Sequence, residues 1–472
     1  MRNRPDIDPR APGLGVGLAA DLADLDWTDI PPDLVQKLKL YALDNLGVLG
    51  GAAHAAGIAE LNAALLAFEP SDGLATVLTT GRRISPPAAA FANGSTAHAL
   101  DFDDQHDPAR IHVLSTVLPA ALAASEFEGN ISGKQFLTAL AIGGELSCRL
   151  GLTCHSSLGR GWHPTTALGA LAATAAAAKI FRLDARQMLN ALAIAFVQMS
   201  GTTQSNADGV LTKRMGAGFA ARTGLFAAQL ARHGLTGPPR FLEGAAGLFA
   251  LHERGDVTPE RLTEALGQNW RIGELSIKPF PCCRAAHTVI ELGLKLRKQG
   301  LKIENIDSGQ ILLSRLNWQM VGAPFNPPAV NPVVHAQFNA IYTFVRALLD
   351  GRIDLRTFEA DQIMAPEMAP ARRLHCDETL EIAADAVAPA AVKIRCRDGS
   401  ELSQSIAVMK GSPENPMSTD EIIQKFRSCL EFGLNAEPDA IERFASVVLD
   451  LDRVKNVADL VDAFPTPRRR SP

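Results

Sequence analysis

The sequence predicts a mainly α protein in which a large all-helical domain is formed by both chain ends and a smaller α+β lid domain is inserted between them. Ala- and Leu-rich helical patterns fill the chain up to about residue 270. Strand patterns then appear at 309–316 and 392–408, and helical patterns return after residue 411. A chain of 472 residues is long enough for two hydrophobic cores. We therefore expect a large domain of residues 1–270 and 411–472 and a small domain of residues 271–410.

Capping signals in the first half of the chain indicate where helices begin. Pro164 follows His163 and suits the first turn of a helix that continues through PTTALGALAATAAAAKIF. Asp184, followed three residues later by Gln187, has the pattern of a capping box and predicts the start of the next helix. Small side chains in these segments let helices approach closely, so we expect a buried helical core.

The middle region changes to strand signals. In 392–396, Val392, Ile394 and Cys396 alternate with charged residues, and the Asp398-Gly399 pair that follows suits a tight turn. This pattern predicts a β-hairpin over 392–408. After a proline-bearing loop, the stretch from Ser418 to Glu421 has the pattern of another helix cap, and helices continue to about residue 464.

Composition and charge exclude several classes of protein. A net charge of −5 offers no bulk attraction to nucleic acid or anionic lipid. The N-terminus lacks the apolar stretch of a signal peptide, and the Ala-rich runs are broken too soon to span a membrane. The seven cysteines are irregularly spaced and include no CxxC pair, which favours a reducing cytoplasm over a disulfide framework, a zinc site or an iron–sulfur centre. No glycine-rich nucleotide motif occurs.

The stretch HALDFDDQHDPARIH, residues 98–112, concentrates carboxylates and histidines. Asp101, Asp103, Asp104, His106 and His112 are potential metal ligands, but they lack a helical pair of histidines four residues apart and any ordered ligand loop. A solvated acidic turn with helix-capping aspartates is the plain alternative. The apolar residues around the stretch favour a third interpretation, in which a buried Asp holds a His for acid–base chemistry.

Further candidates stand beside turns and helix starts. His163 precedes a helix start, where free N–H groups suit a carboxylate, although a core histidine is equally consistent. Lys213 and Arg214 begin a small-residue helix, so one of these cations is a candidate to point inward rather than into solvent. Lys278 lies at the expected domain junction.

Cys283 and Tyr342 complete the candidates from the small domain. Cys283 is one of two adjacent cysteines that also fit the description of small buried hydrophobes. Tyr342 is one of only two tyrosines and fits a half-buried helix position equally well. Cations and histidines recurring beside turns of an acidic chain favour a small anionic substrate with several carboxylates.

The motifs together resemble the MmgE/PrpD family. The resemblance rests on segments in the same order along roughly residues 12–460: NGSTAHALDFDD, GWHPTTALGALAATAAAAK, LTKRMGAGFAARTGL, IKPFPCCRAAH and the helix that carries Tyr342. It implies a homodimer, chemistry without a metal or an organic cofactor, and a pocket between the domains. The pocket residues carried over by motif are Asp101, His112, His163, Lys213, Lys278 and Tyr342.

The resemblance also suggests roles. His112 and His163 would transfer protons, Lys213 and Lys278 would bind carboxylates or act as acid or base, and Tyr342 would donate a proton or hydrogen bond. Asp101 would orient a partner. Gln105, Arg214 and Cys283 are further candidates for substrate binding.

Several positions depart from decarboxylase-like members of the family. Gln105 replaces a Thr, Cys283 and Gly216 replace His, and Val113-Leu114 replace Pro-Ser. We therefore expect first a lyase that removes water from a 2-methylcitrate-like hydroxy-polycarboxylate. An epimerase or isomerase of a dicarboxylate of the iminodisuccinate kind is second, and a cis-aconitate-type decarboxylase third. A helical binding protein without catalytic activity is the alternative from another class.

Overall fold

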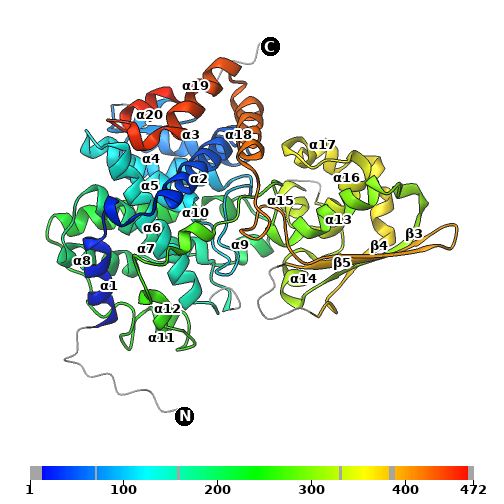
Figure 1. Ribbon diagram of the computed structural model, residues 1–472, viewed down its shortest axis with the longest axis horizontal. Helices are drawn as coiled ribbons and strands as arrows, with labels where there is room; N and C mark the ends of the chain where they lie inside the picture. Colours follow the sequence, from blue (N-terminus) through cyan, green and yellow to red (C-terminus); the bar gives the residue numbers. More distant parts are fainter. Residues whose placement is uncertain (1–12, 70–71, 157–159, 329–331, 382–387, 466–472) are drawn as a thin grey trace.

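The computed structural model describes residues 13–69, 72–156, 160–328, 332–381 and 388–465. A helical body forms one side of the molecule, and a smaller part with the main sheet forms the other (Figure 1). The C-terminal segment returns from the sheet to the helical body, where it ends beside the N-terminal helices (Figure 1). The fold is mainly α with only small sheets, as the sequence predicts.

The helical body contains helices from both ends of the described chain. They are α1 (Leu14–Asp24), α2 (Pro32–Gly51), α3 (Ile58–Phe68), α4 (Pro86–His98), α5 (Leu114–Glu128), α6 (Gly133–Thr153), α7 (Pro164–Ile180), α8 (Ala185–Val197), α9 (Gln204–Ala207), α10 (Thr212–Arg232), α11 (Leu248–Leu251), α12 (Glu260–Thr263), α18 (Thr419–Leu434), α19 (Pro438–Leu449) and α20 (Ala458–Ala463). A short antiparallel ribbon of β1 (Ala75–Val77) and β2 (Arg82–Ile84) lies beside them. The 3₁₀ turns of this body include Trp27–Asp29, Arg271–Glu274 and Leu451–Arg453.

Small residues let the central helices of this body cross at close range. A Cβ atom on Gly218 of α10 would lie 2.3 Å from the carbonyl oxygen of Phe91 in α4. On the same helix, a Cβ atom on Gly224 would lie 2.5 Å from the backbone nitrogen of Thr174 in α7. Glycine is therefore required for α10 to pack against both neighbours, and this packing fixes where the ends of α4, α7 and α10 meet.

The smaller part packs helices against a four-stranded sheet of order β4-β3-β5-β6. Its strands are β3 (Ile306–Leu313), β4 (Leu374–Asp377), β5 (Ala390–Cys396) and β6 (Glu401–Ile406), and its helices are α13 (His287–Lys298), α14 (Arg315–Val321), α15 (Pro332–Gln337), α16 (Ala340–Asp350) and α17 (Ala360–Ile363). The 3₁₀ turns here are Arg284–Ala286, Ile303–Asn305, Leu355–Phe358 and Pro366–Arg373. β3 pairs parallel with β4 and antiparallel with β5.

The expected hairpin is confirmed, and the expected strand before it is displaced. β5 and β6 pair antiparallel, and Gly399 in their turn has a φ of 86°, which favours glycine. β3 begins three residues before the predicted 309–316 and ends at Leu313. Ser314 ends it because its side chain accepts a hydrogen bond from the backbone of Asn317 and so starts α14.

The predicted capping boxes also form. The side chain of Asp184 accepts from the Gln187 backbone at the start of α8, and that of Ser418 accepts from the Glu421 backbone at the start of α18. Such caps satisfy backbone N–H groups that have no partner inside the helix.

Two large hydrophobic clusters divide the described residues. One runs from Leu18 to Ile277 and resumes from Ile422 to Phe464, and the other runs from Cys282 to Cys396. α18 lies against α2, where Gly47 and Gly51 leave room for Phe426 and Cys429. The division of the chain near residues 270 and 411 into two domains remains a prediction. Within the described residues, no helix is both long and apolar enough to cross a lipid bilayer.

Candidate active site

Ends of four central helices bring together the candidate side chains. His98 is the last residue of α4, His163 is the N-cap of α7, and Lys213 lies in the first turn of α10. His112 stands two residues before the first residue of α5. The rings of His98 and His112 meet edge to face with centroids 4.7 Å apart, and the His98 and His163 rings are 6.1 Å apart. The close helix crossings thus place three imidazoles and one ammonium group near one another.

The loop between α4 and α5 is held by its own aspartates. Asp101 adopts a left-handed backbone with φ of 53°, which Asp tolerates better than most residues. The carboxylate of Asp104 accepts hydrogen bonds at 3.1 Å from the backbone nitrogens of both Val113 and Leu114. This contact caps α5 and fixes the position of His112 immediately before the helix. Burial, followed by the nearby Asp103, raises the pKa of Asp104 to about 8.

Asp101 lies between two buried lysines. Its Oδ1 is 2.7 Å from Nζ of Lys213, and its Oδ2 is 3.5 Å from Nζ of Lys278. Lys278 also donates a 2.8 Å hydrogen bond to the backbone carbonyl of Asp101. Burial by itself would raise the pKa of Asp101, but Lys213 and Lys278 outweigh it and hold that pKa well below its usual value. Asp101 therefore stays a carboxylate and anchors both ammonium groups.

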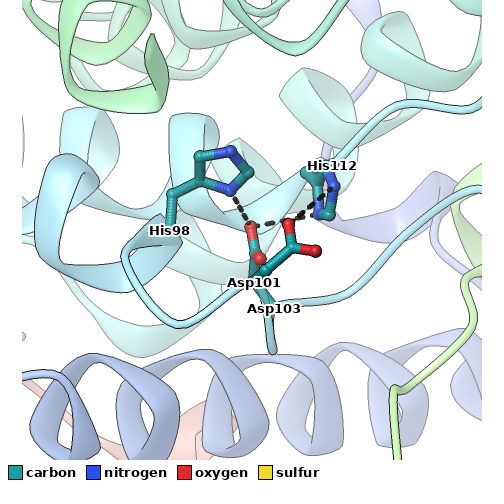
Figure 2. Close-up of side chains that lie close together, drawn as sticks. All are labelled: His98, Asp101, Asp103 and His112. Atoms are coloured by element: carbon teal, nitrogen blue, oxygen red, sulfur yellow. Dashed lines mark hydrogen bonds and ion pairs between the residues drawn. The ribbon is translucent and has the colours of Figure 1, made fainter. Parts of the chain in front are cut away.

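Asp103 lies between two histidines (Figure 2). Nδ1 of His98 is 2.8 Å from Oδ2 of Asp103, and Nδ1 of His112 is 3.2 Å from the same oxygen, although this second approach is not aligned as a hydrogen bond. Burial opposes ionisation of Asp103, but His112 and His98 outweigh it and lower its pKa well below the usual range. Burial and Lys213 lower the pKa of His98 to about 4, so His98 is a neutral imidazole that donates to Asp103.

His112 is placed to exchange protons with a bound molecule. Its Nδ1 faces Asp103, while its Nε2 lies 3.9 Å from Oδ1 of Asp101. A carboxylate beside one ring nitrogen favours a proton there and leaves the other nitrogen for chemistry. The sequence leaves open which Asp stands beside a His, and the structure places Asp103 against Nδ1 of His112 while Asp101 contacts the two lysines.

His163 is held by Thr166 of α7. Nδ1 of His163 lies 3.1 Å from the Thr166 hydroxyl. Burial, with His98 and Lys213 nearby, lowers the pKa of His163 well below its usual value, so it is neutral near pH 7. A Cβ atom on Gly216 would lie 2.4 Å from Oγ1 of Thr166, so the glycine provides the room that this threonine occupies.

One small cavity of about 80 Å³ collects most of the predicted site residues. Those that line it are Asp101, Gln105, His112, His163, Lys213, Lys278 and Cys283. Burial raises the pKa of Cys283 to about 12, so this wall residue is a neutral thiol. Among the described lining residues, the cations are Lys213, Lys278, Arg110 and Arg284, and Asp101 is the single carboxylate.

Two predicted site residues lie elsewhere, which corrects the expectation for each. Tyr342 is fully buried in the core of the smaller part, where its hydroxyl donates to the carbonyl of Thr357 and its ring stacks on Phe325. Arg214 points away from the cavity because it follows Lys213 on a different face of α10, and it donates to the carbonyl of Ala56 at 2.5 Å. Neither side chain lines the cavity.

Sequence reasoning missed His98 and Asp103 as a pair, and Arg284 as a lining residue. His98 and Asp103 are five residues apart, a spacing that no helix or strand brings together, so only the loop conformation joins them. Arg284 lines the cavity and holds Asp107 at 3.1 Å. Gln105 donates to that same Asp107 at 3.1 Å, so its amide is fixed in the wall.

His98, Asp101, Asp103 and His112 also have the composition of a metal site. Their ligand atoms lie within 4.8 Å of one another. Two ammonium groups already occupy the side of Asp101, and a divalent cation there would be repelled by both. The charge arrangement favours proton transfer and anion binding over metal binding.

Comparison with known proteins identifies the family of this chain. Residues 16–260 match the MmgE/PrpD N-terminal domain, and residues 280–451 match the MmgE/PrpD C-terminal domain. The chain belongs to the MmgE/PrpD family. The matched C-terminal domain of the MmgE/PrpD family takes in α18 and α19, which pack on the helical body here.

The chain is also similar to individual proteins named as cis-aconitate decarboxylases or as decarboxylase-like. The chain is 30% identical to the cis-aconitate decarboxylase-like protein oryM of Aspergillus oryzae, covering 93% of this chain and 95% of that protein. It is 29% identical to a cis-aconitate decarboxylase of Aspergillus terreus, covering 94% of each chain. It is 28% identical to the human cis-aconitate decarboxylase, covering 82% of this chain and 80% of that one.

Proposed function

We propose that this protein is a cofactor-independent lyase that acts on a small polycarboxylate. The observation that carries the proposal is the charge of the cavity, where four cations face one carboxylate among the described lining residues. Three of these cations, Lys213, Lys278 and Arg284, are buried, and buried cations bind carboxylates strongly because little water screens them. His112 and His163 line the same cavity and supply groups for proton transfer.

Decarboxylation of cis-aconitate or a close analogue is the first reaction to test. Two of the named relatives are cis-aconitate decarboxylases and the third is a cis-aconitate decarboxylase-like protein, and the chain matches each over most of its length. In such a step a protonated His112 would give its proton to one carbon of the substrate double bond. The bond to the departing carboxylate would then break, its electron pair would form the new double bond, and carbon dioxide would leave. Lys213 and Lys278 would hold the carboxylates that remain.

Dehydration of a 2-methylcitrate-like hydroxy acid is the second candidate. Two wall residues favour it, because Gln105 and the neutral Cys283 replace the Thr and His of decarboxylase-like members. A base would remove a proton α to a carboxylate, and an acid would protonate the departing hydroxyl. His112 and His163 would share these two roles.

One experiment separates the reactions. Purified protein would be incubated with cis-aconitate and, separately, with 2-methylcitrate, while released carbon dioxide and the proton NMR spectrum in deuterated water are followed. Carbon dioxide from cis-aconitate identifies a decarboxylase. Replacement of the methyl doublet of 2-methylcitrate by an allylic methyl singlet, or a new vinyl signal, without carbon dioxide identifies a dehydratase.

The controls extend this experiment to the remaining alternatives. Deuterium entering a substrate without any elimination product would identify an isomerase or epimerase instead. Folded protein that binds a polycarboxylate but turns over none of these compounds would favour the binding protein without catalysis. The homodimer and the cytoplasmic location remain proposals, and light scattering in solution tests the first.

A further inference from the structure

A larger groove adjoins the small cationic cavity. Its volume is about 940 Å³, against about 80 Å³ for the cavity. Asn206, Met320 and Phe338 line both spaces, so the two share part of their walls. Sites for small molecules usually enclose roughly 300–1,000 Å³, and the cationic cavity by itself is below that range. A small polar cavity thus lies directly beside a much larger groove.

The groove differs from the cavity in charge. Its walls include Val210, Leu211, Leu316 and Val334. Among its described lining residues the ionisable ones are Asp208 and His335, and burial lowers the pKa of His335. The groove therefore contributes no fixed cation that would hold a phosphate or another carboxylate, and Asp208 repels both.

The wall of the groove is built on the segment that carries Lys213. The backbone nitrogen of Lys213 donates to the carbonyl of Val210 at 3.2 Å, so the groove-lining turn leads directly into the first turn of α10. The Lys213 ammonium lies 5.2 Å from the centre of the Phe338 ring. Phe338 therefore stands at the border between the two spaces, and a substituent on a molecule whose carboxylates lie on Lys213 and Lys278 would pass it to reach the groove.

We propose that the preferred substrate is a polycarboxylate with an apolar alkyl substituent, and that the groove holds this substituent. This inference rests on the proposed function and specifies its substrate class. The cationic cavity selects the carboxylate head, and the groove excludes charged tails while it removes an alkyl chain from water. Each buried methylene should raise affinity about fourfold until the chain leaves the groove.

The test is a series of cis-aconitate and citrate analogues with unbranched substituents from methyl to octyl. Binding is measured by calorimetry and turnover by product formation, on the full chain. We expect both affinity and kcat/KM to rise with chain length over at least three methylenes. Tighter binding along the series without any turnover would overturn the proposed lyase but keep the groove assignment. Turnover of the unsubstituted acids with no gain from longer chains would overturn this inference and keep the lyase.

Two exposed valines provide a matched pair of variants. Val210→Asp places a carboxylate in the groove, and Val408→Asp places one at a similarly exposed position in another part of the fold, with exposed fractions of 44% and 45%. We expect Val210→Asp to lower the ratio of long-chain to short-chain kcat/KM towards one. Val408→Asp should leave this ratio unchanged. An equal ratio in both variants would count against the groove as the alkyl site.

Discussion

The Lys213 ammonium lies 2.7 Å from the carboxylate of Asp101, and both side chains are buried. A second pair with the same geometry stands elsewhere in the protein, where Lys425 lies 2.7 Å from Asp44. Only the first of these two pairs lines the cationic cavity. The two pairs therefore allow the cost of losing a buried ion pair to be separated from the loss of substrate binding.

Lys425→Met should destabilise the protein at least as much as Lys213→Met, whereas Lys213→Met should have the larger effect on catalysis. Lys425→Met leaves the buried Asp44 without its partner, which costs about 3–5 kcal/mol. Lys213→Met still leaves Asp101 with Lys278 at 3.5 Å, so its cost is no larger. Lys213→Met should also lower kcat/KM by about 10²–10³, because a cation that holds the substrate is lost. Urea unfolding measures the free energy of unfolding, and steady-state kinetics on the folded fraction measure kcat/KM. Equal residual activity in the two variants would show that Lys213 does not bind the substrate.

Asp103→Asn should lower kcat by about 10²–10⁴ with little change in KM. Asp103 does not line the cavity, but it lies against Nδ1 of both His98 and His112, and an amide cannot hold the same ring protons. The matched control is Asp104→Asn, the neighbouring buried aspartate, which should keep most of the activity. Steady-state kinetics on both variants make the comparison, and an effect confined to KM would contradict an orienting role.

The free energy of unfolding should depend on pH because of Asp104. Its pKa is raised from 3.8 to about 8 in the folded state, so the folded protein retains a proton that the unfolded chain releases. The stabilisation from this proton is complete below about pH 4 and is lost as pH rises towards 8, at up to about 1.4 kcal/mol per pH unit. Asp104→Asn should remove this slope. Denaturant unfolding between pH 4 and 8 measures it, and parallel curves for the two proteins would refute the assignment.

Tyr342→Phe should reduce stability and leave turnover unchanged. The variant removes a buried hydrogen bond to the Thr357 carbonyl, which costs about 1–3 kcal/mol when the acceptor stays buried. The Tyr342 ring packs between Phe325 and Phe358 and does not line the cationic cavity. Thermal unfolding and kcat/KM are measured together. A large fall in kcat with normal stability would restore the proton-donating role that the sequence suggests.

Treatment with a chelator should leave turnover intact. His98, Asp101, Asp103 and His112 have metal-ligand chemistry, but Lys213 and Lys278 already neutralise Asp101. The measurement is activity after dialysis against EDTA, followed by addition of zinc or manganese. Loss of activity that either metal restores would show that this cluster holds an ion.

Local sequence patterns predict several elements of the fold correctly. The capping boxes at Asp184 and Ser418 and the hairpin turn at Gly399 depend on residues within a few positions of each other, so the sequence predicts them directly. The prediction placed this strand at 309–316, whereas β3 spans Ile306–Leu313. The error arises because the Ser314 cap lies within the residues that carry the strand pattern.

The sequence by itself determined the mainly helical class, the family resemblance and most residues of the cationic cavity. Tertiary structure decided how those residues are paired. The loop from Asp101 to His112 brings Asp103 against His98 and His112, and the close crossings of α10 with α4 and α7 bring Lys213 to Asp101. The same packing removed Tyr342 and Arg214 from the cavity. Contacts between residues far apart in the chain depend on how helices cross, and no local pattern encodes that angle.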